Sequence, residues 1–205
     1  MPSQTFFNLP KTKQNIIIEA SLNEFKRVLL KDASINKIIA NANISRGSFY
    51  NYFTDINDIY FYALNKYKAK LNTLIEKTLT EKNGNLIETT KVLFDEIVNY
   101  CLEDKNKNLF KNVFLNFNYH TEIRNKLYCH NLEEKYKLIE LVSKINKDKL
   151  NIKTEEELFY IIDIISSFTI HGLIEIFLNN NKQNEVKDKI EKQLEILKRG
   201  IWKED

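Results

Sequence analysis

Three observations predict an all-α fold for this chain. Four glycines and two prolines in 205 residues are too few for an all-β protein, which needs a turn about every 8–12 residues. With 43% apolar and 29% charged residues, the chain can bury a core and does not have the composition of a disordered one. The apolar residues recur at helical spacing along most of the sequence. We expect about nine or ten helices, in a small head (residues 1–53) and a larger helical body (residues 54–205).

The head is predicted to begin with an amphipathic helix over residues 12–30. Its apolar side chains fall at i, i+4, i+7 and i+11, at Ile18, Leu22, Phe25 and Leu29. Ser34 precedes a second, shorter apolar-periodic stretch and is expected to be its N-cap. Asn43 follows that stretch, and Asn is the residue most able, after Gly, to adopt the left-handed conformation that ends a helix.

A third helix is predicted to begin at Ser45. Ile44 precedes this cap and Phe49 lies four residues beyond it, which is the hydrophobic staple arrangement. This helix is barely two turns long, because Asp55 caps a fourth helix with Asp58 at its third position. The fourth helix is expected to stop at Asn83-Gly84-Asn85, the clearest turn signal in the chain.

The body continues with apolar-periodic segments separated by short polar breaks. No repeat of fixed period appears among them. They lie near residues 86–103, 107–118, 121–146, 155–179 and 184–202.

Two short helices joined by a turn of three or four residues make a helix-turn-helix, the second helix of which fits the DNA major groove. Phe49 and Phe53 are predicted to point into the core of the head, leaving a polar face on the same helix. Arginine can bridge guanine O6 and N7, asparagine can pair with adenine, and tyrosine hydroxyls can reach phosphates. Ser34 and Ser45 mark two helix starts whose free N–H groups suit phosphate.

The distribution of charge agrees with contact between the head and a polyanion. The net charge of the whole chain is only +3. Residues 1–53 contain seven basic and three acidic residues, a balance of +4, whereas residues 54–205 have a balance of −1. We expect a basic head that contacts the polyanion and a nearly neutral body with a different role.

Residues 12–62 resemble the DNA-binding head of TetR-family transcriptional regulators. The matching positions are Phe25, Ser34-Ile35, Ile38, Ala42, Ile44 to Tyr50, and Tyr52-Phe53. The resemblance implies that Arg46, Gly47, Ser48, Tyr50 and Asn51 touch bases or the adjoining backbone. It implies phosphate contacts from Ser34, Ser45 and Tyr52, and Lys37 completes the predicted DNA-binding set. Ile56 stands where the family usually has a lysine, so that phosphate contact is expected to be missing.

Residues 155–202 are predicted to form the interface of a homodimer. The last helix has a narrow apolar stripe, and the helix before it is apolar on most sides. We expect the body to cover one side of this helix pair and a second subunit to cover the other. A four-helix interface is also what the family resemblance implies. The predicted interface residues are Ile164, Phe168, Val186, Ile190, Leu194, Leu197 and Ile201. The alternative is a monomer core with a capping helix.

The resemblance further implies a cavity in the body for a small hydrophobic or aromatic effector. The candidate lining residues are Tyr67, Leu71, Phe94, Cys101, Phe114, Phe117 and His171. For most individual aromatic residues in the middle helices, simple packing is the favoured interpretation. A histidine satisfied within the core is the commoner role for a residue in the position of His171.

The sequence therefore predicts a homodimeric repressor that binds a palindromic DNA operator and is released by an effector. The alternatives are a ligand-independent or nucleoid-associated DNA-binding protein and a helical enzyme or carrier. We find no Gly-rich phosphate loop, metal-ligand spacing or nucleophile motif, so no catalytic residue, metal or cofactor is predicted. The sequence shows no signal peptide and no uncharged run long enough to span a membrane, which predicts a cytoplasmic protein without a membrane partner.

Overall fold

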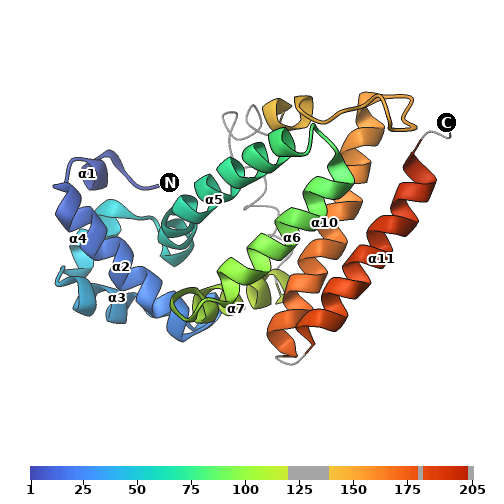
Figure 1. The fold of residues 1–205 in the computed structure, drawn as a ribbon. Coiled ribbons are helices and arrows are strands. Elements are labelled where there is room, and N and C mark those ends of the chain that lie inside the picture. The colour runs from blue at the N-terminus through green and yellow to red at the C-terminus, as the bar shows by residue number, and fades with distance from the viewer. Residues whose placement is uncertain (120–138, 180–181, 203–205) are drawn as a thin grey trace. The chain divides into compact units, whose positions relative to one another are not determined.

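The computed structural model describes residues 1–119, 139–179 and 182–202. Within those ranges the chain forms helices, turns and one isolated β-bridge between Leu150 and Trp202, and no strand, so the all-α prediction is confirmed. The predicted segment 121–146 lies mostly outside the described residues. The helices (Figure 1) are α1 (Gln4–Phe7), α2 (Lys11–Arg27), the 3-10 helix η1 (Leu30–Asp32), α3 (Ile35–Ala42), α4 (Arg46–Tyr52), α5 (Ile56–Glu81), α6 (Leu86–Leu102), α7 (Asp104–Tyr119), α10 (Glu155–Leu178) and α11 (Gln183–Ile201).

The chain divides into two compact units. Unit 1 comprises residues 1–70 and 104–127, and unit 2 comprises residues 71–103 and 128–205. The whole of the predicted head lies in unit 1, together with the first part of α5 and with α7. Contacts between α2 and α7 account for the presence of α7 in that unit.

The helix starts and stops in the head follow the predicted caps. Asn43 ends α3 in the left-handed conformation, with φ 49° and ψ 54°. The Ser45 side chain accepts a hydrogen bond from the Ser48 amide at 3.0 Å, and Asp55 accepts one from the Asp58 amide at 2.9 Å. The left-handed Asn43 ends α3, and the Ser45 cap starts α4 three residues after Asn43. This stop and restart produces the helix-turn-helix.

The core of the head combines aromatic and aliphatic side chains. Ile38, Phe49 and Phe53 are at most 1% exposed, as the sequence predicted. The patterns did not predict α1, whose Phe6 is fully buried and lies 4.9 Å, centroid to centroid, from the Phe53 ring. Phe6 therefore extends the head core into a segment that precedes the recognised motif.

Helix α2 ends earlier than the pattern predicts, at Arg27 instead of residue 30. Val28 adopts an extended conformation, and η1 then carries Leu30 into the core. The side-chain nitrogen of Asn112, on α7, lies 2.8–3.1 Å from the carbonyl oxygens of Phe25, Lys26 and Val28. A side chain from a distant helix thus supplies the hydrogen bonds that the end of α2 lacks.

The turn between α5 and α6 uses the predicted Asn-Gly pair. Asn83 and Gly84 have φ values of 50° and 71°. A Cβ on Gly84 would lie 2.5 Å from the carbonyl oxygen of Lys144, and the amide of Asn146 donates to the Gly84 carbonyl at 2.9 Å. Only glycine fits here, both for its conformation and for the close approach of a second backbone.

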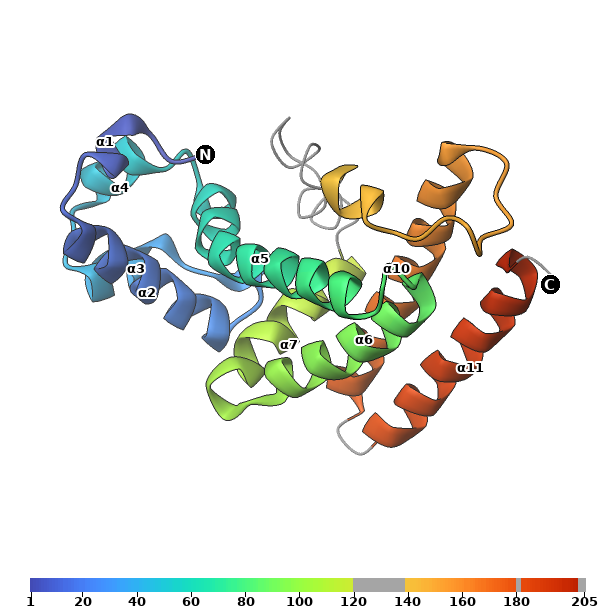
Figure 2. The ribbon, with the colours of Figure 1, turned by 45° about the horizontal axis from the view of Figure 1, so that its top comes forward.

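Helices α10 and α11 run side by side in unit 2 in both views (Figures 1 and 2). A Cβ on Gly172 of α10 would lie 2.9 Å from the Ile190 side chain of α11 and 3.2 Å from Phe94 of α6. Val186, Ile190 and Leu194 are at most 2% exposed within the single chain. The prediction that these three residues form a dimer interface is therefore wrong, because they pack inside the unit. Leu197 and Ile201 are half-buried.

Ion pairs flank the inward face of α11 on both sides. Lys187 pairs with Asp95 of α6 at 2.7 Å, and Lys91 of α6 pairs with Glu195 at 2.8 Å. On the other side, Lys189 pairs with Glu175 of α10 at 2.8 Å. The apolar stripe lies between these pairs and faces the interior.

Helix α10 keeps an apolar face exposed. Tyr160 is 58% and Ile164 is 51% exposed, Phe168 is half-buried, and His171 is exposed on the same side. We call these four residues the open face of α10. Among the described residues, α10 is the one helix long and apolar enough to cross a membrane, a test that the core helix of a soluble protein also passes.

Candidate nucleic-acid interface

Helix α4 separates its side chains into a buried and an outward face. Phe49 is fully buried, whereas Arg46, Tyr50 and Asn51 are exposed. Ser48 and Tyr52 are half-buried beside that face, and Lys37 is exposed on α3. Arg46, Tyr50 and Asn51 therefore share the outward side of a short helix that is held by its opposite side, whereas Ser48 and Tyr52 lie at the edges of that side.

The two predicted phosphate-binding serines differ in their surroundings. Ser45 Oγ lies 2.9 Å from Ser48 Oγ and also accepts the Ser48 amide, so its hydroxyl is engaged in capping α4. Ser34 stands at the N-cap position of α3 without a side-chain capping bond. Its backbone amide instead donates to a carboxylate oxygen of Glu24 at 2.9 Å.

Glu24 connects the end of α2 to the start of α3. Its carboxylate is 2% exposed and accepts two hydrogen bonds from Arg27, at 2.7 and 2.8 Å. The Arg27 hydrogen bonds lower the pKa of Glu24, burial opposes them, and the Ser34 amide lowers it further. The carboxylate consequently stays ionised and fixes the position from which α3 begins.

The guanidinium of Arg46 is held in place across the helix-turn-helix. Its Nη1 donates to Asn36 Oδ1, on α3, at 2.7 Å. Its Nη2 lies 3.4 Å from the Tyr50 hydroxyl, and its central carbon lies 5.6 Å from the centroid of the Tyr50 ring. An exposed arginine is thus ordered by one residue from each of the two helices.

Gly47 occupies an open position on α4. A Cβ there would lie 3.9 Å from Ser45 Oγ, which is ordinary contact, and Gly47 does not have a positive φ. Glycine inside a helix is less favourable than alanine by about 1 kcal/mol. The fold therefore does not require glycine at this position.

The last turn of α4 is tied down by the N-terminal segment. Ser3 Oγ donates to the Asn51 carbonyl at 2.6 Å, and the Ser3 amide donates to the Tyr52 carbonyl at 2.9 Å. Tyr52 also packs edge-on against Phe6, with the ring centroids 6.1 Å apart. These contacts explain why Tyr52 is half-buried instead of fully exposed.

Helix α7 supports the head through two asparagines. Besides Asn112, Asn116 donates to the Tyr60 hydroxyl at 3.2 Å and accepts from the Leu30 amide at 3.4 Å. Burial raises the pKa of Tyr60 to about 12. The hydroxyl therefore stays protonated and remains a neutral member of a buried hydrogen-bonded group.

The predicted effector residues do not fall in one unit. Tyr67 and Phe114 belong to unit 1, and Leu71, Phe94, Cys101 and His171 belong to unit 2. Phe94, Cys101 and Phe114 are buried, Tyr67 is half-buried, and Leu71 is 37% exposed. His171 is exposed in the single chain and is not the core histidine that the sequence favoured. The side chain of Phe117 lies outside the described residues.

Cys101 has the environment of a packing residue. It is 2% exposed, and burial raises the pKa of its thiol to about 12. A thiol that stays protonated is a poor nucleophile and a poor metal ligand.

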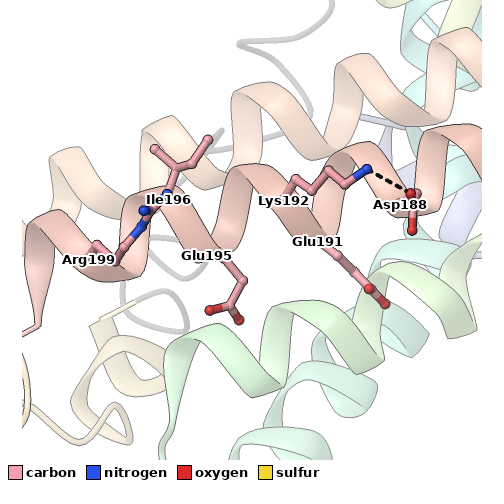
Figure 3. Close-up of a pocket in the computed structure, with 6 residues that line it drawn as sticks. All are labelled: Asp188, Glu191, Lys192, Glu195, Ile196 and Arg199. Atoms are coloured by element: carbon pink, nitrogen blue, oxygen red, sulfur yellow. Dashed lines mark hydrogen bonds and ion pairs between the residues drawn. The ribbon is translucent and has the colours of Figure 1, made fainter.

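The structure shows a shallow hollow on the outer surface of α11 (Figure 3). All of its lining side chains come from that one helix: Asp188, Glu191, Lys192, Glu195, Ile196 and Arg199. Lys192 pairs with Asp188 at 3.0 Å. The hollow is open and none of its lining residues is aromatic, so it is not the aromatic cavity that the sequence predicted.

Several residues that build this site were not found from the sequence. Asn36, Glu24 and Asn112 each act through a partner that is 10 or more positions away, and no local spacing marks them. The adjacent Phe6-Phe7 pair in an otherwise polar start was the signal that could have revealed α1.

A helix-turn-helix with a polar outward face, followed by a helical body, defines a class of helical transcriptional regulators. Residues 85–201 match the family model described as "Tetracyclin repressor-like, C-terminal domain". This match covers more than half of the chain, and the chain belongs to the TetR family of transcriptional regulators.

Solved structures of low sequence identity share the fold. SmeT, the repressor of the Stenotrophomonas maltophilia multidrug efflux pump SmeDEF, is 12% identical with a TM-score of 0.63, over 97% of this chain and 93% of SmeT. A putative TetR-family regulator from Mesorhizobium loti is 14% identical with a TM-score of 0.60, over 94% and 98% of the two chains. One from Shewanella sp. PV-4 is 11% identical with a TM-score of 0.62, over 94% and 99%. No curated protein sequence matches the chain.

Proposed function

We propose that this chain is a sequence-specific DNA-binding regulator in which α4 reads the major groove. The observation that carries the proposal is the outward face of α4, where Arg46, Tyr50 and Asn51 project from a helix held by the buried Phe49. Gly47 supports it, because a position without a side chain lets the backbone approach DNA closely. Lys37 on α3 and the hydroxyl groups of Ser34 and Tyr52 are the proposed phosphate contacts.

The direct test is selection of bound double-stranded DNA from a random pool by the full-length chain. The expected product is a palindrome with half-sites about one helical turn, or 34 Å, apart. On that DNA, Arg46→Ala and Tyr50→Ala should each weaken binding by about 1–3 kcal/mol. Lys149→Ala, an exposed substitution in a loop of unit 2, is the control and should bind normally. Unchanged binding by both α4 variants would exclude α4 as the reading helix.

The proposed assembly is a homodimer formed through the open face of α10. Single subunits rarely leave large aromatic and aliphatic side chains this exposed without a partner. Ile164 and Phe168, both predicted interface residues, lie on this face, and Ile196 of the neighbouring α11 is 61% exposed. A two-fold dimer would place the two heads on the two halves of a palindrome. The same dimer would cover the face that makes α10 resemble a membrane-spanning helix, in keeping with a cytoplasmic protein.

The proposed regulation is repression that ends when a small hydrophobic or aromatic effector binds the body. Phe94 and Cys101 give α6 a buried, uncharged side suited to such a ligand. Helix α7 falls within the segment matched by the C-terminal family model, yet Asn112 bonds it to α2 of the head. A ligand that moves α7 would therefore move α2 as well.

Thermal-shift screening with apolar compounds, followed by operator titration in the presence of each hit, tests this regulation. The expected result is a compound that raises the melting temperature and lowers operator affinity. Hits that never alter operator affinity would exclude effector release and favour a ligand-independent DNA-binding protein.

A further inference from the structure

The Arg46 guanidinium carries five N–H donors and no acceptor. The atom of Asn36 that faces it at 2.7 Å must therefore be the carbonyl oxygen, which accepts one of these donors. The Tyr50 hydroxyl takes a second, from Nη2. Three donors remain for a ligand, and the plane in which they lie is set by Asn36 on one side and by Tyr50 on the other.

The remaining donors match one base edge better than the others. Guanine presents two acceptors, N7 and O6, on its major-groove edge, and arginine can bind both at once. Adenine presents one acceptor and one donor there, and cytosine presents an amino donor. A guanidinium that has only donors to offer selects guanine.

Fixing the guanidinium before DNA arrives strengthens that choice. A free arginine side chain samples many rotamers, and binding must order it at an entropic cost. Asn36 lies on α3 and not on α4, so it ties the arginine to the frame of the helix-turn-helix as a whole. To reach a base other than guanine, the Arg46 guanidinium would have to break its bond to Asn36 or leave its remaining donors unpaired.

We infer that Asn36 is a positioning residue that aims Arg46 at a guanine in each half of the operator. The inference rests on the proposed reading of DNA by α4 and names the base that it recognises. Asn36 acts through Arg46, so its effect should be confined to the base position that Arg46 reads.

The experiment uses the palindrome selected by the full-length protein and a panel in which each half-site position is changed to the other three bases. Binding of each panel member is measured by fluorescence anisotropy at one fixed salt concentration, because protein–DNA affinity depends strongly on salt. The wild-type chain should lose about five- to 150-fold in affinity when one particular guanine is replaced, and Arg46→Ala should abolish that preference.

Asn36→Ala should reduce the same guanine preference by about two- to tenfold and leave the preferences at all other positions unchanged. Asn36→Asp keeps an acceptor toward Arg46 and should retain the guanine preference. Asn41→Ala, an exposed asparagine on the same helix, is the matched control and should behave as wild type. Urea unfolding of each variant checks that the head remains folded.

The outcomes separate the two proposals. If the wild-type chain selects no sequence, the proposed function fails. If it selects a palindrome and Arg46→Ala abolishes a guanine preference that Asn36→Ala leaves intact, the positioning role is overturned. An Asn36→Ala effect that is uniform over all positions, or that falls on a base other than the one read by Arg46, overturns it too. The positioning role is also overturned if the selected half-site shows no guanine preference that depends on Arg46.

Discussion

The outward face of α4 and the open face of α10 are both exposed, but the first is polar and the second is largely apolar. On α4, Arg46 is bonded to Asn36 and Ser45 caps its own helix, while the aromatic residues are buried beneath. On α10, Tyr160 and Ile164 are more than half exposed. Polar groups can remain in water until a ligand displaces it, whereas an apolar face is stable only when it is covered. We therefore propose a polar ligand for the first face and a second apolar surface for the other.

The largest expected effect comes from a charge on the open face of α10. Ile164→Asp removes apolar burial worth about 1.5–3 kcal/mol from each subunit, so a two-fold dimer should lose about 3–6 kcal/mol. Light scattering at micromolar concentration should show the mass fall from twice 24.3 kDa to 24.3 kDa.

Ile16→Asp is the matched control for the comparison of the two regions. Ile16 is 46% exposed on α2 of the head, close to the exposure of Ile164. The Ile16 variant should keep the dimer mass. A dimer that survives Ile164→Asp, or dissociates equally with Ile16→Asp, would remove the distinction between the two regions.

The next effect tests the support that α7 gives the head. Asn112→Ala leaves three carbonyl oxygens at the end of α2 without their donor, at a cost of about 1–3 kcal/mol. Urea unfolding followed by circular dichroism should show a lower midpoint, and operator affinity should fall with it. Asn108→Ala, an exposed substitution one turn earlier on α7, should leave the midpoint unchanged. Equal midpoints for the two variants would show that α7 does not stabilise α2.

A smaller effect should depend on pH. Glu24→Gln weakens the bonds to Arg27 and Ser34, and we expect a loss of about 1–2 kcal/mol at pH 7, since solvent screens the half-exposed Arg27. The folded-state pKa of Glu24 is lowered from 4.5, so its stabilisation is present above pH 4.5 and is lost as pH falls through the lowered value.

The difference in unfolding free energy between wild type and Glu24→Gln should therefore shrink below pH 4.5. Glu19→Gln, at an exposed carboxylate paired with Lys66, is the control and should change stability little at either pH. A difference that grows in acid would contradict the assigned direction of the pKa shift.

The smallest effect on stability is expected at Gly47. Gly47→Ala should leave the unfolding free energy unchanged or raise it by up to about 1 kcal/mol, because helix propensity improves and no atom is crowded. Gly47→Leu should remain folded and lose operator affinity, since its side chain stands between α4 and the DNA. Destabilisation by Gly47→Ala would mean that the fold itself requires this glycine.

Local sequence signals predicted the end of α3 and the start of α4 because these boundaries depend on residues within four positions of each other. Ser45 caps α4 through Ser48, and Asn43 ends α3 through its own backbone conformation. Apolar periodicity likewise located α6, α10 and α11 to within two residues. The same periodicity misassigned Val186, Ile190 and Leu194 to a dimer interface, because a stripe shows that a helix face is covered and does not show by what.

By itself, the sequence determined an all-α chain with a helix-turn-helix whose buried and outward residues can be read from spacing. Hydrogen bonds within one or two turns and the 3.6-residue period are properties of neighbouring residues, so they need no knowledge of the rest of the fold. Only the tertiary structure decided that Asn36 holds Arg46, that Asn112 ends α2, and that α11 turns its stripe inward. Those contacts join residues from 10 to 92 positions apart, and no local pattern encodes them.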